Sequence, residues 1–339
     1  ILAASMLEAL GVETSRAFSL IETGENLERH DEPSPTRSAV LVRLGHSHIR
    51  IGTFQRLAAN AETEALKQLV TYVRETYYPD LSVPEDGNEA LALFEAVCSR
   101  VARVGAQWMA AGFVHGVLNT DNIAITGESF DYGPWRFLPR FDANFTAAYF
   151  DHNGLYAYGR QPQALLWNLA RLAECLLEFA PHAGLTDVLS RFPALYEREL
   201  DLAWCRRLGV RPDTVETDRA LRHAVTLFLE TSGIPFHCLP FDWYGGSGGA
   251  ERALNGERGD LYRDSAFAEA RGLLEKRDPV ASYSADHPYF SGGQPCDMLI
   301  TTVEALWTKL SEQDDWAALG DKLTEIDLMA DALGQYRAL

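Results

Sequence analysis

Apolar residues recur at intervals of three and four positions in several segments, the spacing of one face of an α-helix. Residues 61–78 show this pattern, and Pro79 ends it because proline lacks the backbone donor that a helix needs. Residues 88–111 repeat it up to Gly112, a residue type that often terminates helices. Further helices are predicted at residues 1–10, 162–176, 192–208 and 217–230, and towards the end of the chain, with the last at 316–339.

Shorter segments alternate between apolar and polar residues and predict strands at 16–21 and 39–44. Residues 113–137 contain further short β-like pieces. Residues 232–259 are rich in glycine and proline and predict a long flexible loop. Its GGSGG run at 245–249 lacks the lysine and helix start that follow a phosphate-binding loop. The expected fold class is therefore α+β and mainly helical.

Composition narrows the range of functions. The chain has 339 residues, 47% of them hydrophobic, so it can bury a large core. Its net charge of −18 repels a phosphate backbone and argues against nucleic acid as a partner. No apolar stretch is long enough to predict a membrane span. The five cysteines lack metal or redox spacing, which favours a reducing, cytoplasmic location, and Cys98 and Cys175 are predicted to be buried.

The candidate chemistry lies in residues 113–137, FVHGVLNTDNIAITGESFDYGPWRF. A polar loop carries His115, Asp121 and Asn122, and two short strands are then predicted to form a hairpin that ends at Asp131. Such a hairpin would bring both carboxylates to one end of a site. Asn and Asp are also common in ordinary turns, so one Asp-Asn pair alone has a purely structural explanation. The ordered set, followed by Tyr132, favours a nucleotide site.

The three acidic and amide side chains suggest a division of labour. Asn122 and Asp131 offer hard oxygen ligands, which suit Mg²⁺ or Mn²⁺ together with phosphate oxygens and water. Asp121 is then available to accept a proton from an attacking hydroxyl. Transfer from a metal-bound triphosphate requires this combination of base and metal ligands.

Histidines and arginines gather in one short segment between residues 43 and 50. Arg43 and Arg50 could converge on phosphate oxygens, which guanidinium groups bind through two parallel hydrogen bonds. An isolated surface arginine would instead be only a solvated charge. His46 and His48 are a weak candidate for a metal site with His115, because the spacing positions no further ligand.

These motifs resemble the SelO (YdiU) family of protein adenylyltransferases, which have a protein-kinase-like fold. The resemblance rests on HGVLNTDN followed by DYGPWRF, and on RLGHSHIRIGTFQ at residues 43–55. It extends to SMLEALGVETSRAFSL at 5–20 and to residues 151–176, so that it is dense over residues 1–178. General kinase-like families do not combine TDN and DYGP with the SHIRxGTF pattern.

The resemblance implies a role for each site residue. Asp121 matches the proposed catalytic base, and Asn122 and Asp131 match the metal ligands. Arg43 and Arg50 match the two arginines that hold the phosphates of ATP. ATP is expected to bind flipped relative to ordinary kinases, so that AMP passes to a Ser, Thr or Tyr hydroxyl of a protein and pyrophosphate leaves.

Two other functions remain open at this stage. An ordinary kinase-like phosphotransferase would carry nearly the same base and metal ligands. A catalytically inactive nucleotide-binding pseudokinase would keep the binding residues without transfer. The orientation of ATP separates the first from an adenylyltransferase, and sequence does not reveal it.

The resemblance also implies a domain organisation. We expect residues 1–60 to be the remainder of a kinase-like N-lobe, 61–190 a kinase-like C-lobe, and 191–339 a helical C-terminal extension. The family's phosphate-contacting Lys and its partner Glu would precede Ile1, which suggests a truncated chain rather than a lost site. The last cysteine is Cys296, so redox control through a C-terminal chalcogen is unsupported. A eukaryotic member would be expected in mitochondria, and a bacterial one in the cytoplasm.

Overall fold

The computed structural model describes residues 1–28, 34–83 and 87–335. Long helices dominate it, and the strands form two small antiparallel sheets. The expected α+β, mainly helical class is therefore confirmed. The first seven helices are α1 (Leu2–Ala9), α2 (Ile51–Ala59), α3 (Thr63–Tyr77), α4 (Glu89–Ala111), α5 (Gln161–Cys175), α6 (His182–Arg207) and α7 (Val215–Ser232).

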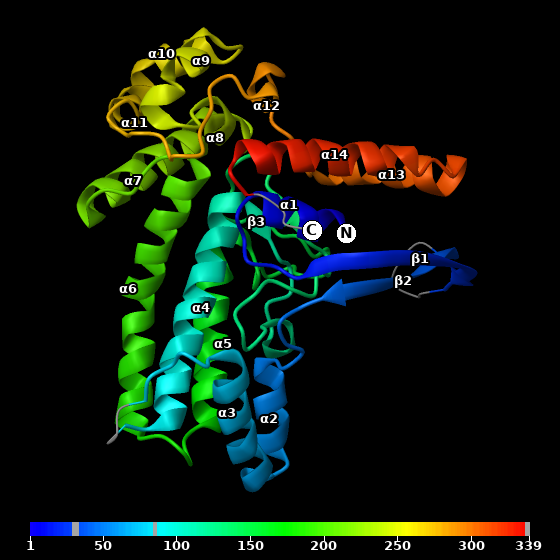
Figure 1. Ribbon diagram of the computed structural model, residues 1–339, viewed down its shortest axis with the longest axis vertical. Helices are drawn as coiled ribbons and strands as arrows, with labels where there is room; N and C mark the ends of the chain where they lie inside the picture. The colour runs from blue at the N-terminus through cyan, green and yellow to red at the C-terminus, as the bar shows by residue number, and fades with distance from the viewer. Residues whose placement is uncertain (29–33, 84–86, 336–339) are drawn as a thin grey trace.

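Helices α4, α5 and α6 run alongside one another and form the long axis of the molecule (Figure 1). Asn88 begins α4 by accepting a hydrogen bond from the Leu91 N–H, and Gly112 ends it in the left-handed conformation. The apolar face between these ends is buried, as Phe94 and Val101 illustrate. The sequence predicted α3, α4, α5 and α7 to within about two residues, because each buries a regular apolar stripe.

The β1–β2 hairpin projects from the helical body beneath α13 (Ile300–Gln313) and α14 (Ala317–Ala332) (Figure 1). It consists of β1 (Arg16–Leu27) and β2 (Thr36–Leu44), which pair antiparallel with two irregularities in register. Arg37 of β2 holds the hairpin to α13, because its guanidinium donates to the Leu310 carbonyl at 2.6 Å and pairs with Asp314 at 2.7 Å. The second sheet is only β3 (Phe113–Val114) with β4 (Arg136–Phe137).

The prediction of a long flexible loop at 232–259 is wrong. Short helices occupy much of this segment, and Gly246 is buried. Gly245 and Gly246 have φ of 93° and 55°, and a Cβ on Gly246 would lie 2.7 Å from the Arg277 carbonyl oxygen. Glycine is needed here because the backbone is left-handed and the neighbouring atoms are close, and not because the segment is flexible. The remaining helices are α8 (Cys238–Asp242), α9 (Ala250–Asn255), α10 (Gly259–Arg263), α11 (Ala268–Leu274), α12 (Pro288–Ser291), α13 (Ile300–Gln313) and α14 (Ala317–Ala332).

Two boundaries also differ from expectation. Helix α6 begins at His182, ten residues before the predicted start at 192, because Leu185 and Val188 extend its buried face. The final helix ends at Ala332, and residues 336–339 of the predicted helix lie outside the described residues. All five cysteines are unpaired and buried, which confirms the prediction for Cys98 and Cys175.

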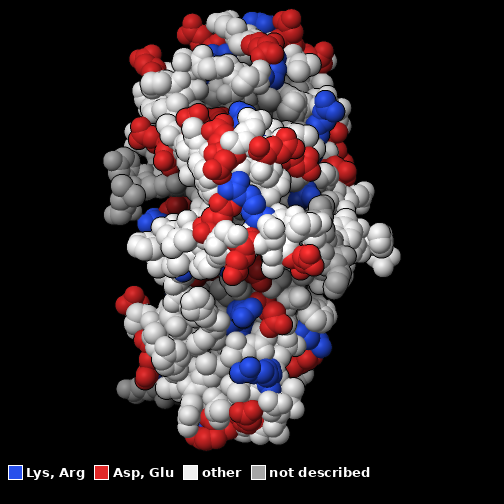
Figure 2. Space-filling view, turned by 90° about the vertical axis from the view of Figure 1, so that its right-hand side faces the viewer, with Lys and Arg blue, Asp and Glu red and all other residues white. Residues whose placement is uncertain are grey.

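Acidic and basic side chains are interspersed over the face seen in Figure 2, where no continuous basic band crosses the described residues. Among the helices of the described chain, none is long and apolar enough to span a membrane.

Candidate active site

The polar loop that follows α4 is anchored by a buried histidine. The His115 N–H donates to Gln161 Oε1 at 3.0 Å, and its Nε2 lies 3.1 Å from the Phe130 carbonyl oxygen. Burial lowers the pKa of His115, so the ring is neutral and Nε2 carries the donated proton. This ring therefore ties the loop to the residue that precedes Asp131.

The hairpin predicted to carry Asp131 does not form. Ala124 instead makes an antiparallel bridge to Arg50, and Ser129 makes a parallel bridge to Thr14. Two backbone hydrogen bonds from this arrangement, Ile51 N–H to the Ile123 carbonyl and Ile125 N–H to the Ile49 carbonyl, measure 3.1 and 2.9 Å. Residues far apart in sequence, rather than neighbours, thus satisfy the backbone of these short segments.

The same pairing brings Asp121 to the start of helix α2. Asp121 lies in a single 3₁₀ turn (Thr120–Asn122), where the Asn119 side chain accepts its N–H at 3.0 Å. Arg50, the residue before α2, donates from Nη1 to the Asp121 carbonyl at 3.0 Å. A Cβ on Gly52 would fall 2.0 Å from Asp121 Oδ1. The carboxylate thus approaches the positive end of the α2 dipole at a point where only glycine leaves room.

Asp131 is held in a strained conformation. Its φ is 56°, a left-handed value that costs free energy for a residue with a side chain. Tyr132, the residue after Asp131, is held in place by its hydroxyl, which donates to the Ser129 carbonyl at 3.0 Å and contacts Thr14. Burial raises the pKa of Tyr132, so it remains a neutral donor. Strain of this kind concentrates at functional sites.

The two arginines of the sequence motif converge on one aromatic ring. The guanidinium carbons of Arg43 and Arg50 lie 5.9 and 5.6 Å from the centre of the Phe130 ring. Arg43 also lies 5.9 Å from the ring of Tyr132. The structure therefore brings both arginines to the residues on either side of Asp131.

Asn122 is oriented by its own loop. Its Nδ2 donates to the Val117 carbonyl at 2.9 Å, which leaves the amide oxygen available as a metal ligand. Together with the Asp131 carboxylate this gives two oxygen ligands of the type that Mg²⁺ and Mn²⁺ prefer, so the residues fit such an ion. Within the described chain no group of three or more His, Cys, Asp or Glu could hold a metal. The His46 N–H donates to Glu128 Oε1 at 2.9 Å, and its ring nitrogen Nδ1 contacts the other oxygen of the same carboxylate.

Four charged side chains at this site share one property. Among the residues that the structure describes, none of them forms an ion pair. They are Arg43, Arg50, Asp121 and Asp131. Unpaired charges of both signs around one loop form a site that can accept a polyanion and its counter-ion.

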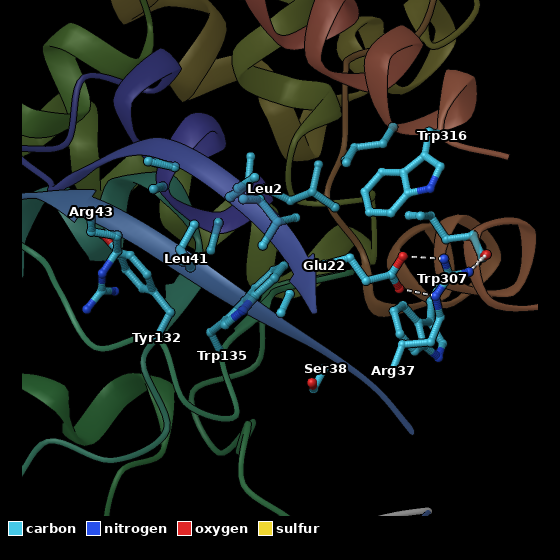
Figure 3. Close-up of a pocket in the computed structure, with 18 residues that line it drawn as sticks. Leu2, Glu22, Arg37, Ser38, Leu41, Arg43, Tyr132, Trp135, Trp307 and Trp316 are labelled. Carbon is cyan, nitrogen blue, oxygen red and sulfur yellow. Dashed lines mark hydrogen bonds and ion pairs between the residues drawn. The ribbon is translucent and has the colours of Figure 1, made fainter. Parts of the chain in front are cut away.

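Arg43 also borders an apolar cavity of about 400 Å³ (Figure 3). Arg43 and Tyr132 lie at one end, and Arg37, paired with Glu22, lies at the other. The cavity lies between α1, the β1–β2 hairpin and α13–α14 and is partly open to solvent. Its apolar lining includes Leu2, Leu41, Trp135, Trp307 and Trp316.

Sequence reasoning named the charged residues but missed two that position them. Gly52 leaves room for Asp121, and the ring of Phe130 lies near the guanidinium groups of both arginines. The helix that begins at Ile51 was not predicted either. Gly52 stands inside the RIGTF motif that supported the resemblance, so its presence there was the available signal.

Comparison with known proteins agrees with the resemblance. The family described as Protein adenylyltransferase SelO matches residues 1–241. A Protein nucleotidyltransferase YdiU of Synechocystis sp. is 38% identical over 96% of this chain and 71% of its own length. Its namesake in Gloeobacter violaceus is 39% identical over 95% and 67%. That of Synechococcus elongatus is 49% identical, over 64% of this chain and 44% of its own length.

The family match covers more than half of the chain, and the first two relatives align with nearly all of it. Their names describe nucleotidyl transfer, the class of reaction expected from the motifs. The chain belongs to the SelO family of protein adenylyltransferases.

Proposed function

We propose that this protein transfers AMP from ATP to a Ser, Thr or Tyr hydroxyl of a protein and releases pyrophosphate. The observation that carries the proposal is the set of four unpaired charges around the Asp121 loop. A triphosphate would pair with the two arginines and a divalent cation with Asp131, and Asp121 would be left to accept a proton.

Arg43 and Arg50 would hold the phosphates. Their guanidinium groups lie near the same Phe130 ring, so they can reach neighbouring oxygens of one polyphosphate. In the expected flipped orientation they neutralise the charge that develops on the departing pyrophosphate.

Asn122 and Asp131 would hold Mg²⁺ or Mn²⁺. When bound, the ion supplies charge neutralisation and makes the α-phosphorus more electrophilic. The chain's own contribution is to fix the two ligands, through the Asn122 bond to the Val117 carbonyl and the constrained backbone of Asp131.

Asp121 would act as the general base. Its exposed carboxylate accepts the proton of the acceptor hydroxyl as that oxygen attacks the α-phosphorus. A bond forms between the hydroxyl oxygen and phosphorus, and the bond to the β-phosphate oxygen breaks. Electrons of the breaking bond leave with pyrophosphate.

The proposal includes a division of the chain into a kinase-like N-lobe remainder (residues 1–60), a kinase-like C-lobe (61–190) and a helical extension (191–339). The arginines come from the first part and the carboxylates from the second. A cytoplasmic location is part of the same proposal and can be tested by cell fractionation.

Isotope labelling of ATP tests the proposed reaction. The full-length protein is incubated with an acceptor protein and ATP labelled with ³²P at the α or the γ position. Label from the α position on protein, together with released pyrophosphate, supports adenylyl transfer. Retention of the γ label instead identifies a kinase. Retention of neither label, together with thermal stabilisation by ATP, identifies an inactive nucleotide-binding protein.

A further inference from the structure

A closed loop, residues 146–157, lies between Asp131 and helix α5. Its two ends are joined, because the Tyr158 N–H donates to the Phe145 carbonyl at 2.9 Å and the Gly159 N–H to the Ala143 carbonyl at 2.8 Å. Inside it, the Asp151 carboxylate accepts from two successive backbone N–H groups at 2.7 and 2.8 Å. These hydrogen bonds constrain the backbone of the loop and so lower the entropy cost of ordering it on binding.

The base of this loop packs on the proposed catalytic loop. Ala147 and Ala148 are buried. Gly116, the residue after His115, has a φ of 88°, and a Cβ there would lie 3.1 Å from the Ala147 Cβ. The loop thus packs directly against the segment that leads from His115 to Asp121.

The tip of the loop is apolar and exposed. Tyr149, Phe150 and Leu155 are 70%, 51% and 58% exposed, and the two aromatic rings meet edge to face with centres 5.3 Å apart. Of these three residues, Tyr149 borders a polar hollow of about 410 Å³ whose lining includes His152 and Arg160. Aromatic side chains on a rigid support, beside polar groups, are typical of surfaces that contact other proteins.

We propose that this tip docks the protein acceptor, by contact with an apolar side chain that flanks the reacting hydroxyl. The inference rests on the proposed function, which requires a polypeptide to place its hydroxyl beside Asp121. The loop that supports the tip packs on the same segment as Asp121, which favours the acceptor over an unrelated partner. A chain of net charge −18 does not attract acidic acceptors. The exposed side chains Phe150 and Leu155 are apolar, so they match an apolar neighbour of the hydroxyl.

Paired acceptor peptides test the proposal in the full-length protein. Two synthetic peptides share a central Thr and differ in one adjacent residue, Leu in one and Ser in the other. The enzyme variants are Phe150→Ser and Leu155→Ser, and the control is Leu227→Ser on α7, whose side chain is 56% exposed. Initial rates of α-³²P transfer are measured against peptide concentration, and ATP affinity is measured by calorimetry.

We expect the wild type and the control to favour the Leu peptide. In Phe150→Ser and Leu155→Ser the KM for the Leu peptide rises about tenfold, with ATP affinity and thermal stability unchanged. The preference for Leu over Ser is lost at the same time. A merely structural role would alter stability without removing this preference.

The outcomes separate the two proposals. If the wild type modifies no peptide or protein, the proposed function fails. If the wild type is active and both tip variants retain its KM and its preference, the docking proposal alone is overturned. Loss of a dimer in the variants, with unchanged peptide kinetics, would overturn it as well and identify a second copy as the occupant.

Discussion

Charged side chains are arranged in opposite ways in two regions of the molecule. Between α6 and α7, Asp201 and Asp218 are fully buried, and each lies within 3 Å of a guanidinium group, 2.6 Å from Arg222 and 2.8 Å from Arg277. Around the Asp121 loop the charges lie near one another without ion pairing. The first arrangement stabilises the fold and the second leaves charges ready for a ligand.

Loss of a carboxylate is therefore expected to affect the stability of the fold differently in the two regions. Removing a paired, buried carboxylate leaves an uncompensated guanidinium in the core. Removing an unpaired, exposed one costs the fold little, because no partner is left behind. The predictions below use this contrast.

The largest effect is expected from Asp121→Ala. Loss of a general base lowers the rate of transfer by about 10²- to 10⁴-fold. The free energy of unfolding changes by less than about 1 kcal/mol, because the side chain forms no ion pair in the described chain and loses only its interaction with the α2 dipole. Initial rates at saturating ATP and urea titrations measure the two quantities. Full transfer activity in this variant would remove Asp121 from the role of base.

Asp218→Ala is expected to show the reverse. Because Asp218 is buried and paired with Arg277, its loss lowers the free energy of unfolding by about 3–5 kcal/mol. Activity per folded molecule stays the same. Urea unfolding provides the measurement, and Asp218→Asn serves as a milder variant if the alanine protein does not fold. A loss below about 1 kcal/mol in both variants would contradict the structural role.

Gly52→Ala should affect the site without affecting the core. The added methyl group has to displace Asp121, so kcat falls about tenfold while the melting temperature changes little. Gly272→Ala in α11 is the matched control, because nothing lies within 4 Å of the Cβ that it adds. Equal kcat values for Gly52→Ala and the control would show that the close approach to Asp121 is unimportant.

The last prediction concerns acidic pH, where the effect per pH unit is small. Arg207 is buried without a carboxylate partner in the described chain, and its Nη2 lies 3.2 Å from His237 Nδ1. Burial, together with the smaller effect of the Arg207 charge, lowers the pKa of His237 to about 3. The unfolded chain therefore takes up this proton first, near pH 6.5, so stability is complete above that pH and is lost as pH falls towards 3.

Because His237 takes up a single proton, its contribution to the pH dependence of stability has an upper limit. One proton changes the free energy of unfolding by at most about 1.4 kcal/mol per pH unit. Urea unfolding between pH 6.5 and 4 measures the slope, and His237→Gln should reduce it. An identical slope in the variant would show that His237 does not titrate on unfolding.

Local patterns explain why the long helices could be predicted and the site only partly. The apolar stripes of α3 and α4 are complete within their own segments, so periodicity is sufficient. The bridge between Arg50 and Ala124 joins residues far apart in sequence, and a local pattern contains no information about it. For that reason a hairpin was expected where two longer-range bridges form.

The chemistry of the site was easier to predict than its geometry. Asp121, Asn122 and Asp131 were recognised because their residue types suit a base and a metal ion. Gly52 could not be recognised, since its role depends on a side chain that reaches it only in the folded chain. The GGSGG run was misinterpreted for a similar reason, because glycine serves close packing as well as flexibility.

The central claim is that the unpaired charges form a site for a metal-bound triphosphate. Calorimetric titration of Mg²⁺–ATP into the wild type and Asp131→Ala tests it most directly, with ATP in the presence of a chelator as the reference. We predict that the variant loses metal-dependent binding, with an affinity at least about tenfold lower than that of the wild type. An unchanged Mg²⁺–ATP affinity in Asp131→Ala would contradict the metal assignment and the claim with it.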